Sequence, residues 1–221
     1  MESVLAEIKK QVLAYNRDGV RELAEKALAQ GVEPLALVET LREVIAGVGE
    51  QFASHRVFLP ELVGAAGAME AGMAVAQAAI ARRGLQAASF ATVAIGTVAG
   101  DIHSIGKNLV AALLSAAGAT VLDLGINVPV EMFLAEAQEY QPQVLAMSAL
   151  LTTTAPEQRK VIERLAAAGL RESVKVIVGG GAISAAFAES IGADGYGGTA
   201  PQAVELVRRL VGRAAGRTDG R

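Results

Sequence analysis

The sequence predicts an α/β protein in which an N-terminal four-helix bundle is followed by a flavodoxin-like sheet of five parallel strands. Two observations lead to this fold class. From residue 4 to about residue 81 the apolar residues recur at helical spacing, as in Leu41, Val44 and Ile45. After Arg82-Arg83-Gly84 the pattern changes to short β-branched runs that alternate with helical stretches. Such alternation is typical of parallel strands joined by right-handed crossovers.

Three breaks divide the first part into four helices. They fall at residues 16–19, 31–34 and 54–60, where glycine, proline, asparagine and serine gather. Four helices of this length are enough for a small bundle. We therefore expect a helical domain over residues 1–88.

The second part contains five apolar runs of strand length. Phe90 to Val98 is rich in β-branched residues and uncharged, as in a strand that is buried on both faces of a parallel sheet. Leu109 to Ala117 then predicts a helix. The strands are expected near 90–97, 119–124, 143–148, 174–178 and 194–197. An α/β domain over residues 89–215 follows, with a frayed tail over 216–221.

Composition excludes several kinds of site and partner. Since the chain has no cysteine, disulfides and thiolate metal sites are excluded, and His, Asp and Glu remain as metal ligands. A net charge of −3, from 20 basic and 23 acidic residues, gives no reason to expect nucleic-acid binding. The uncharged stretch from Ala87 to Gly100 is too short to span a membrane, which takes about 20 apolar residues. Met1 to Lys10 has no apolar export core, so we expect a cytoplasmic protein.

A candidate site follows the first predicted strand. The residues from Gly100 read Gly-Asp-Ile-His-Ser-Ile-Gly, in a loop at the carboxyl end of a strand, where open α/β sheets bind ligands. His103 carries a common metal ligand, and a carboxylate such as Asp101 can bond its second ring nitrogen and make the first more basic. Gly106 has no Cβ, which leaves room for a bulky group against the backbone. The alternative is a capping aspartate and a surface histidine on an ordinary turn.

Three other functions fit the second part poorly. A dinucleotide-binding fold needs Gly-x-Gly-x-x-Gly after the first strand, where the chain has Gly100-Asp101-Ile102-His103. A Walker-type phosphate loop needs Ser or Thr after Gly106-Lys107, where the chain has Asn108. A serine nucleophile at Ser148 would need a Gly-x-Ser-x-Gly elbow, and the sequence has none.

Three short motifs, each directly after a predicted strand, resemble the signature of cobalamin-binding domains. They are Asp-x-His-x-x-Gly over residues 101–106, Ser148-Ala149-Leu150 and Gly179-Gly180. The chain is similar over nearly its whole length to the corrinoid proteins of multi-component methyltransferase systems and to the cobalamin-binding region of methionine synthase. The further segments that carry this resemblance are Phe58-Leu59-Pro60-Glu61-Leu62 with Met69, Asp123-Leu124-Gly125 with Val128-Pro129, Ser148 to Thr154, and Gly192-Ala193-Asp194-Gly195-Tyr196.

The resemblance implies a cobalamin or related cobamide, whose lower base the sequence leaves unknown. His103 would ligate the lower face of its cobalt in place of the cofactor's own nucleotide base. Asp101 would accept a hydrogen bond from the other ring nitrogen, and the Thr154 hydroxyl would continue this relay. Thr154 can also be read as the N-cap of a helix that starts near Pro156.

Further cofactor contacts are implied for the loop residues and for the slot that holds the nucleotide tail. Ser148 and Leu150 would line the slot, and Gly179 and Gly180 would let the tail pass close to the backbone, although glycines after a strand are also ordinary turn residues. Phe58 would cover the upper face of the corrin, or it packs in the helical core. The remaining residues to which the resemblance gives contacts are Ile102, Ser104, Ile105, Gly106 and Thr152.

The implied function is methyl carriage, in which the helical domain acts as a cap over the cofactor. A substrate-specific methyltransferase would load the methyl group, and a second methyltransferase would pass it to tetrahydrofolate or a coenzyme M type thiol. A reductive activase is a further expected partner. The runner-up is a corrinoid-sensing regulator, which would need a basic recognition helix that the acidic first part lacks. A mutase subunit would need a large separate catalytic barrel.

Overall fold

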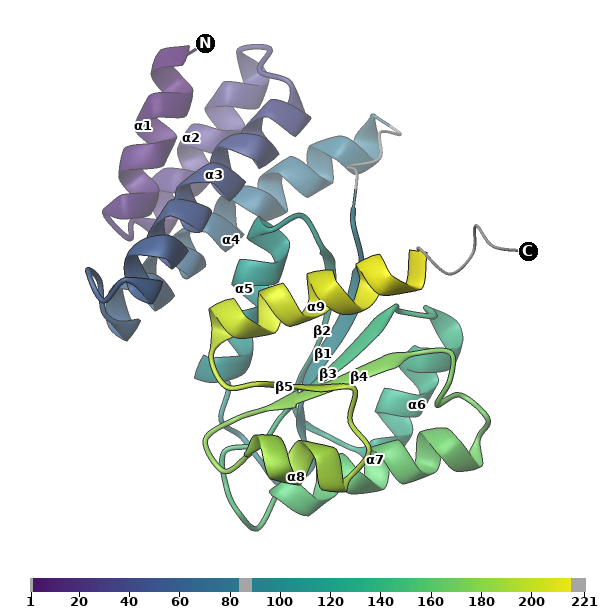
Figure 1. Ribbon diagram of the computed structural model, residues 1–221. Coiled ribbons are helices and arrows are strands. Elements are labelled where there is room, and N and C mark those ends of the chain that lie inside the picture. The colour runs from purple at the N-terminus through teal and green to yellow at the C-terminus, as the bar shows by residue number, and fades with distance from the viewer. Residues whose placement is uncertain (1, 84–88, 216–221) are drawn as a thin grey trace. The chain divides into compact units, whose positions relative to one another are not determined.

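The computed structural model describes residues 2–83 and 89–215. The chain divides into two compact units, Met1–Ala88 with Ser115–Gly118 and Ser89–Leu114 with Ala119–Arg221. Figure 1 shows a helical unit and an α/β unit. The tail predicted over 216–221 lies outside the described residues, as does most of the junction after Arg83.

The described part of the first unit contains four helices, as predicted. They are α1 (Glu2–Leu13), α2 (Arg17–Ala29), α3 (Pro34–Ala53) and α4 (Leu59–Arg82). Helix α4 packs against both α2 and α3, and Leu41, Ile45 and Leu62 are fully buried among them. Among the described residues α4 is the one helix long and apolar enough to cross a membrane, yet 56% of its most apolar window is buried within the protein. Burial of this kind is typical of a core helix.

Local signals set the helix starts. The Asn16 side chain accepts a hydrogen bond from Gly19 N at 3.0 Å, so α2 begins at Arg17, inside the predicted break. Pro34 occupies the first turn of α3, where a missing N–H costs nothing. At the start of α4 the Glu61 carboxylate accepts from the Phe58 N–H.

The second unit contains a parallel sheet of five strands within its described residues. Its order is β2-β1-β3-β4-β5, so the flavodoxin-like order is confirmed. The strands are β1 (Thr92–Val98), β2 (Thr120–Val128), β3 (Val144–Ser148), β4 (Lys175–Gly179) and β5 (Gly195–Gly197). All four strand pairings are parallel.

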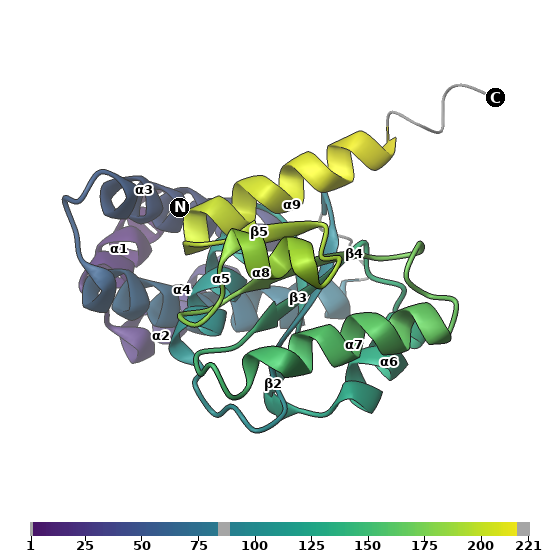
Figure 2. The same ribbon diagram turned by 60° about the horizontal axis from the view of Figure 1, so that its bottom comes forward.

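Helices cover both faces of the sheet (Figures 1 and 2). One face packs against α6 (Val130–Glu139), α7 (Ala155–Ala167) and α8 (Ala185–Ser190) in a continuous apolar core around Phe133 and Leu165. The other face lies toward α5 (Ile105–Ala116) and α9 (Ala200–Ala215). This division follows from right-handed crossovers on either side of β1.

Most strand ends lie within one or two residues of the prediction, and two element boundaries differ from it by four. Strand β2 continues past residue 124 to Val128, because its pairing with β1 shifts register at Gly96 and a positive φ of 85° at Gly125 accommodates the irregularity. Helix α5 begins at Ile105 instead of Leu109, since Asn108 N already donates to Ser104 O at 2.8 Å. Gly106 and Lys107 therefore lie in the first helical turn and not in a loop.

Candidate functional site

The parallel strands bring their carboxyl ends together at one end of the sheet, the lower end in Figure 1. The loops after β1, β3 and β4 begin there, and they carry the three motifs found in the sequence. Residues from positions 101, 148 and 179 thereby become neighbours, although they are far apart along the chain.

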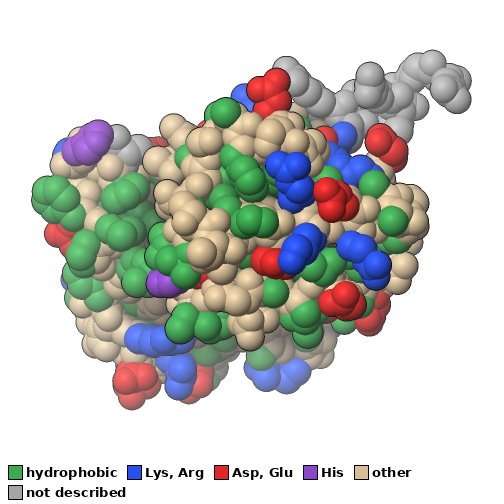
Figure 3. Space-filling view, turned by 90° about the horizontal axis from the view of Figure 1, so that it is seen from below, with side chains coloured by type: hydrophobic (Ala, Val, Ile, Leu, Met, Phe, Trp, Pro, Cys, Tyr) green, Lys and Arg blue, Asp and Glu red, His purple; other side chains and the backbone are tan. Residues whose placement is uncertain are grey.

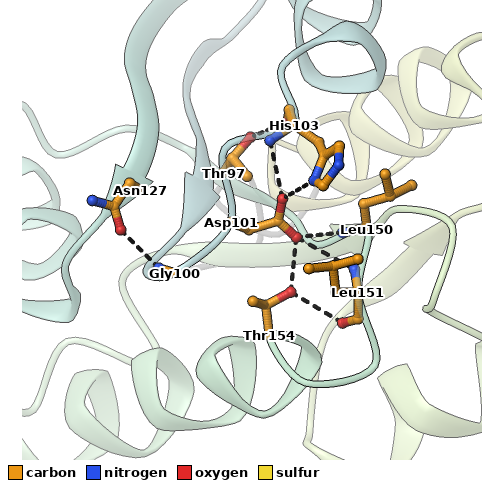
Figure 4. A network of polar contacts seen from close by, with 8 residues as sticks. All are labelled: Thr97, Gly100, Asp101, His103, Asn127, Leu150, Leu151 and Thr154. Carbon is orange, nitrogen blue, oxygen red and sulfur yellow. Dashed lines mark hydrogen bonds and ion pairs between the residues drawn. The ribbon is translucent and has the colours of Figure 1, made fainter.

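The Asp101 carboxylate holds His103 in a defined orientation (Figure 4). Asp101 is fully buried, and its Oδ1 lies 2.7 Å from His103 Nδ1 and 3.0 Å from the His103 backbone N. Because an ionised carboxylate can only accept hydrogen bonds, Nδ1 carries a proton, and in the neutral form of the ring Nε2 presents a lone pair. The ring is 46% exposed, and its Nε2 makes no hydrogen bond to any described residue. The bond from the His103 backbone N also fits the alternative of a capping aspartate beside an exposed histidine, whereas the ring bond at Nδ1 is a feature that this alternative does not require.

The second carboxylate oxygen joins Asp101 to the loop after β3. Oδ2 lies 2.7 Å from Leu150 N, 3.4 Å from Leu151 N and 2.7 Å from Thr154 Oγ1. The Thr154 hydroxyl also lies 3.0 Å from Leu151 O, but its single proton favours the charged acceptor. Thr154 is the N-cap residue of α7, as the alternative has it, but its hydroxyl makes no cap hydrogen bond and donates to Asp101 instead.

These contacts keep Asp101 ionised. Burial by itself raises the pKa of this carboxyl. Hydrogen bonds from the His103 N–H, the Thr154 hydroxyl, the His103 ring and the Leu150 N–H outweigh burial and hold the pKa well below its usual range. At neutral pH a negative charge therefore lies behind the imidazole.

Two further residues hold the His103 loop, and the sequence reasoning missed both. Thr97 Oγ1, buried in β1, donates to His103 O at 3.0 Å. Asn127 Oδ1, at the end of β2, accepts from Gly100 N at 2.7 Å. The sequence signal for Thr97 was a hydroxyl residue within the apolar run that follows Thr92. The signal for Asn127 was weaker, namely an asparagine two residues after a glycine in the same strand.

A cavity of about 400 Å³ opens beside the loop, between the sheet and helices α5 and α9. Its floor is apolar and includes Ile95, Ala146 and Ile177. Four of the predicted cofactor residues line it, namely Gly106, Ser148, Gly179 and Gly180. Lys107, Tyr196 and Thr199 line it as well, and the sequence reasoning had given none of them a cofactor contact.

The two glycines after β4 also have a role within the fold. A Cβ at Gly179 would lie 2.8 Å from Gly197 O on the neighbouring strand. A Cβ at Gly180 would lie 2.0 Å from Ala149 O, and its φ of 119° is one that side chains rarely adopt. Both positions therefore need glycine for backbone packing, whatever lies in the cavity.

Other predicted cofactor residues lie exposed near His103 or outside the cavity lining. Ile102 and Ile105 are 69% and 60% exposed, and Figure 3 shows hydrophobic side chains around an imidazole at this end of the protein. Leu150 is half-exposed and meets Asp101 through its backbone, and neither it nor exposed Thr152 is among the cavity-lining residues. Ser104 is partly buried just before α5.

Phe58 belongs to the helical unit. It stands before α4 and is 70% exposed, so the alternative that it packs in the helical core is wrong. Leu59 and Val63 beside it are exposed too. An exposed aromatic residue with aliphatic neighbours marks a surface that another molecule can cover.

The described residues contain no group of three His, Asp or Glu side chains able to hold a metal ion. His103 is thus a single outward-facing ligand. One imidazole does not make a protein metal site, where four or more ligands are usual. A metal at His103 must bring most of its ligands with it, as the metal of a macrocycle does.

Comparisons with known proteins give a consistent result. The sequence pattern of the B12 binding domain matches residues 91–205, and a second pattern, also described as a B12 binding domain, matches residues 4–77. Trimethylamine corrinoid protein 1 of Methanosarcina acetivorans is 42% identical over 213 residues, which cover 95% of this chain and 98% of that protein. A corrinoid protein of Desulfitobacterium hafniense is 40% identical over 213 residues, covering 96% and 99%.

Solved structures agree with the sequence matches. A chain of the methanol:cobalamin methyltransferase complex of Methanosarcina barkeri matches with a TM-score of 0.81 and 30% identity, over 95% of this chain and 80% of that one. A cobalamin-binding protein of D. hafniense matches with a TM-score of 0.66 and 28% identity, over 93% and 98%. Both units of the fold therefore have counterparts in these proteins.

Proposed function

This chain belongs to the family of B12-binding corrinoid proteins, and from that premise we propose that it carries a methyl group on its corrinoid between two methyltransferases. Its cofactor is a cobalamin or related corrinoid. The observation that carries the proposal is the His103–Asp101–Thr154 relay, which leaves Nε2 without a hydrogen bond to any described residue, three residues before Gly106 at the edge of the cavity.

The residues present fit a corrinoid. A flat macrocycle on His103 would cover the exposed side chains of Ile102 and Ile105, which an empty surface would leave in water. The cavity, with its apolar floor and glycine rim, suits a tail that reaches in beside the sheet. When bound, the corrinoid supplies a cobalt centre that accepts and releases a methyl group.

His103, Asp101 and Thr154 act together in this proposal. His103 Nε2 would hold the cobalt, and Asp101 keeps the ring in the tautomer that frees that nitrogen. The Nδ1 proton is held against Asp101 Oδ1, so the carboxylate gives the ring part of the character of an imidazolate. The Thr154 hydroxyl donates to Oδ2 and moderates this effect, because it competes for the same negative charge.

The helical unit has a protective role in the proposal. Residues 1–88 would act as a cap domain, and Phe58 is the side chain that would cover the bound corrin. The 70% exposure of Phe58, unusual for phenylalanine, supports this assignment. A cap of this kind excludes water and oxygen, and it must move aside during methyl transfer.

We assign three partners and a substrate class. A methylated amine is the proposed donor, because the sequence identity is higher to trimethylamine corrinoid proteins than to the methanol system. A substrate-specific methyltransferase loads the methyl group, and a second one transfers it to tetrahydrofolate or a coenzyme M type thiol. A reductive activase restores the cofactor. We place these reactions in the cytoplasm.

Visible absorption during one methylation cycle tests the function. The protein is loaded with hydroxocobalamin, reduced, and mixed first with trimethylamine and a trimethylamine-specific methyltransferase, then with the acceptor and its methyltransferase. A carrier changes its spectrum on the first addition and returns on the second. A spectrum unresponsive to methylated amines and to methanol with their methyltransferases, together with corrinoid-dependent control of a DNA-binding partner, would contradict the proposal and favour the regulator.

A further inference from the structure

We propose that Asn127, at the carboxyl end of β2, is a positioning residue that fixes the loop bearing His103. This inference rests on the proposed function, since it takes His103 as the cobalt ligand. Asn127 lies outside the three motifs, and its hydrogen bonds go to Gly100 and Asp101, not to the His103 ring. It acts instead on Gly100 and Asp101, which precede His103 in the loop.

Asn127 makes two hydrogen bonds that bracket one short segment of the loop. Its side-chain Oδ1 accepts from Gly100 N at 2.7 Å, and its backbone N donates to Asp101 O at 2.9 Å. Figure 4 shows the amide reaching from the end of β2 to Gly100, on the side of the loop away from Leu150 and Thr154. The segment that carries Asp101 is therefore held from both sides.

The held segment has a special backbone conformation. Gly100 has a φ of 78°, and Asp101 N donates to Val98 O at 3.1 Å in a tight turn. Glycine samples many other conformations, so a contact at its N–H selects one of them. Asp101 in turn orients His103 through two hydrogen bonds, to the backbone N and to the ring. A displacement of Gly100 is thereby transmitted to the imidazole.

The end of β2 is shaped to deliver this amide. The pairing of β2 with β1 shifts register twice, Gly125 has a φ of 85°, and Asn127 itself has a φ of 51°. Bulges re-aim side chains next to functional sites. Asparagine is one of the few side chains that tolerates the left-handed region, which still has a cost. Asn127 thus combines an unfavourable backbone conformation with a specific hydrogen bond. This combination fits a residue that positions the loop better than one that merely connects β2 to α6.

The same strand also holds the other end of the loop. Lys107, in the first turn of α5, is buried, and its Nζ lies 2.6 Å from both carboxylate oxygens of Asp123 on β2. Asp123 Oδ1 further accepts from Gly125 N at 2.9 Å. Strand β2 thus anchors the loop before Asp101 and after Gly106, which leaves His103 on a short bridge between two fixed points.

Three variants separate positioning from simple stability. Asn127→Gly removes Oδ1 but keeps the backbone N–H and suits the positive φ. Asn127→Asp keeps an acceptor for Gly100 N. Ser173→Ala removes a hydrogen bond to Leu170 O near the amino end of β4, away from the site, and controls for the loss of a single contact. Thermal unfolding of all three verifies that each variant is folded.

Two measurements report on the loop. In the protein without cofactor, amide exchange at Gly100 should accelerate in Asn127→Gly by about five- to tenfold, the equivalent of one hydrogen bond. After loading with a cobamide that lacks a nitrogenous base and reduction to Co(II), spin resonance should show part of the cobalt without the histidine nitrogen splitting, and corrinoid should bind about fivefold more weakly. Asn127→Asp and Ser173→Ala should match the parent on every readout.

The outcomes separate the inference from the proposed function. If the parent shows the nitrogen splitting and Asn127→Gly shows the same spectrum and affinity, the positioning role is wrong and the ligand assignment stands. A parent spectrum without histidine nitrogen removes both together. An Asn127→Asp spectrum as altered as that of Asn127→Gly also overturns the inference, because the acceptor would then not be what matters.

Discussion

Asp101 gathers hydrogen bonds from His103, Thr154 and Leu150, so three segments of the α/β unit depend on one ionised carboxylate. In the proposed function the charge on Asp101 therefore also fixes the orientation of the His103 ring. A neutral side chain of the same shape would leave several N–H and O–H groups facing another donor. The charge therefore matters to stability as well as to the cofactor.

Stability at acid pH should report this coupling. The folded-state pKa of Asp101 is depressed, so its contribution to the free energy of unfolding is fully present above the unfolded pKa of about 4. It is lost as pH falls from there through the folded-state pKa, a contribution of roughly 2 kcal/mol. The gap in unfolding free energy between the parent and Asp101→Asn, measured with urea, should therefore shrink below about pH 4.

Thr154→Val provides a graded comparison for that experiment. Loss of the hydroxyl removes one of the contacts that lower the Asp101 pKa. The free energy of unfolding should therefore fall less between neutral and acid pH than in the parent, but it should still fall. A constant gap between the parent and Asp101→Asn from neutral to acid pH would show that the carboxylate is not stabilised in the folded state.

The side chains of the relay could be chosen from the sequence, and their supports could not. Asp101, His103 and Thr154 lie together as the resemblance implied. Thr97 and Asn127 support the loop only because β1 and β2 lie side by side, with β2 irregular at Gly125. The position of such an irregularity depends on pairing between strands, which a single sequence does not specify.

At the scale of elements, the loops after β3 and β4 approach each other so closely that a side chain at Gly180 would clash with the opposite backbone. Gly180→Ala would place a Cβ 2.0 Å from Ala149 O at a φ of 119°. We expect it to destabilise the protein by more than about 2 kcal/mol, through strain and a displaced backbone. Unfolding in urea measures this cost.

Gly47→Ala is the matched control. Gly47 lies inside α3, and a Cβ there would meet nothing within 4 Å. The substitution should stabilise the protein by about 0.5 to 1 kcal/mol, because alanine favours the helix. Equal effects at the two positions would show that the close approach at Gly180 is not a constraint.

The elements themselves followed from hydrophobic periodicity, because each buries a regular set of apolar residues. Their ends were harder to predict. Helix α5 starts at Ile105, where the sequence around Gly106 resembles a loop. Its first turn is fixed instead by the Ser104–Asn108 hydrogen bond and by Lys107, whose charge is paired with Asp123 of another element.

At the scale of the whole molecule, the three motifs all lie in the second unit. A fragment that starts at Ser89 should therefore fold and bind corrinoid, while the reduced cofactor should oxidise faster than in the full chain. Circular dichroism and anaerobic visible absorption measure these two properties. Oxidation at the rate of the full chain would show that residues 1–88 do not protect the cofactor. A folded fragment without affinity for corrinoid would place part of the binding site in the helical unit.

The central claim is that the His103 ring is the lower ligand of cobalt. Electron spin resonance of the Co(II) form tests it most directly, since a bound nitrogen splits the cobalt lines. The parent protein, loaded with hydroxocobalamin and reduced, should show the splitting from one axial nitrogen, and loading with a cobamide that lacks a nitrogenous base should leave it unchanged. His103→Ala should lose the splitting with that same cobamide. Identical spectra for the parent and His103→Ala would contradict the account.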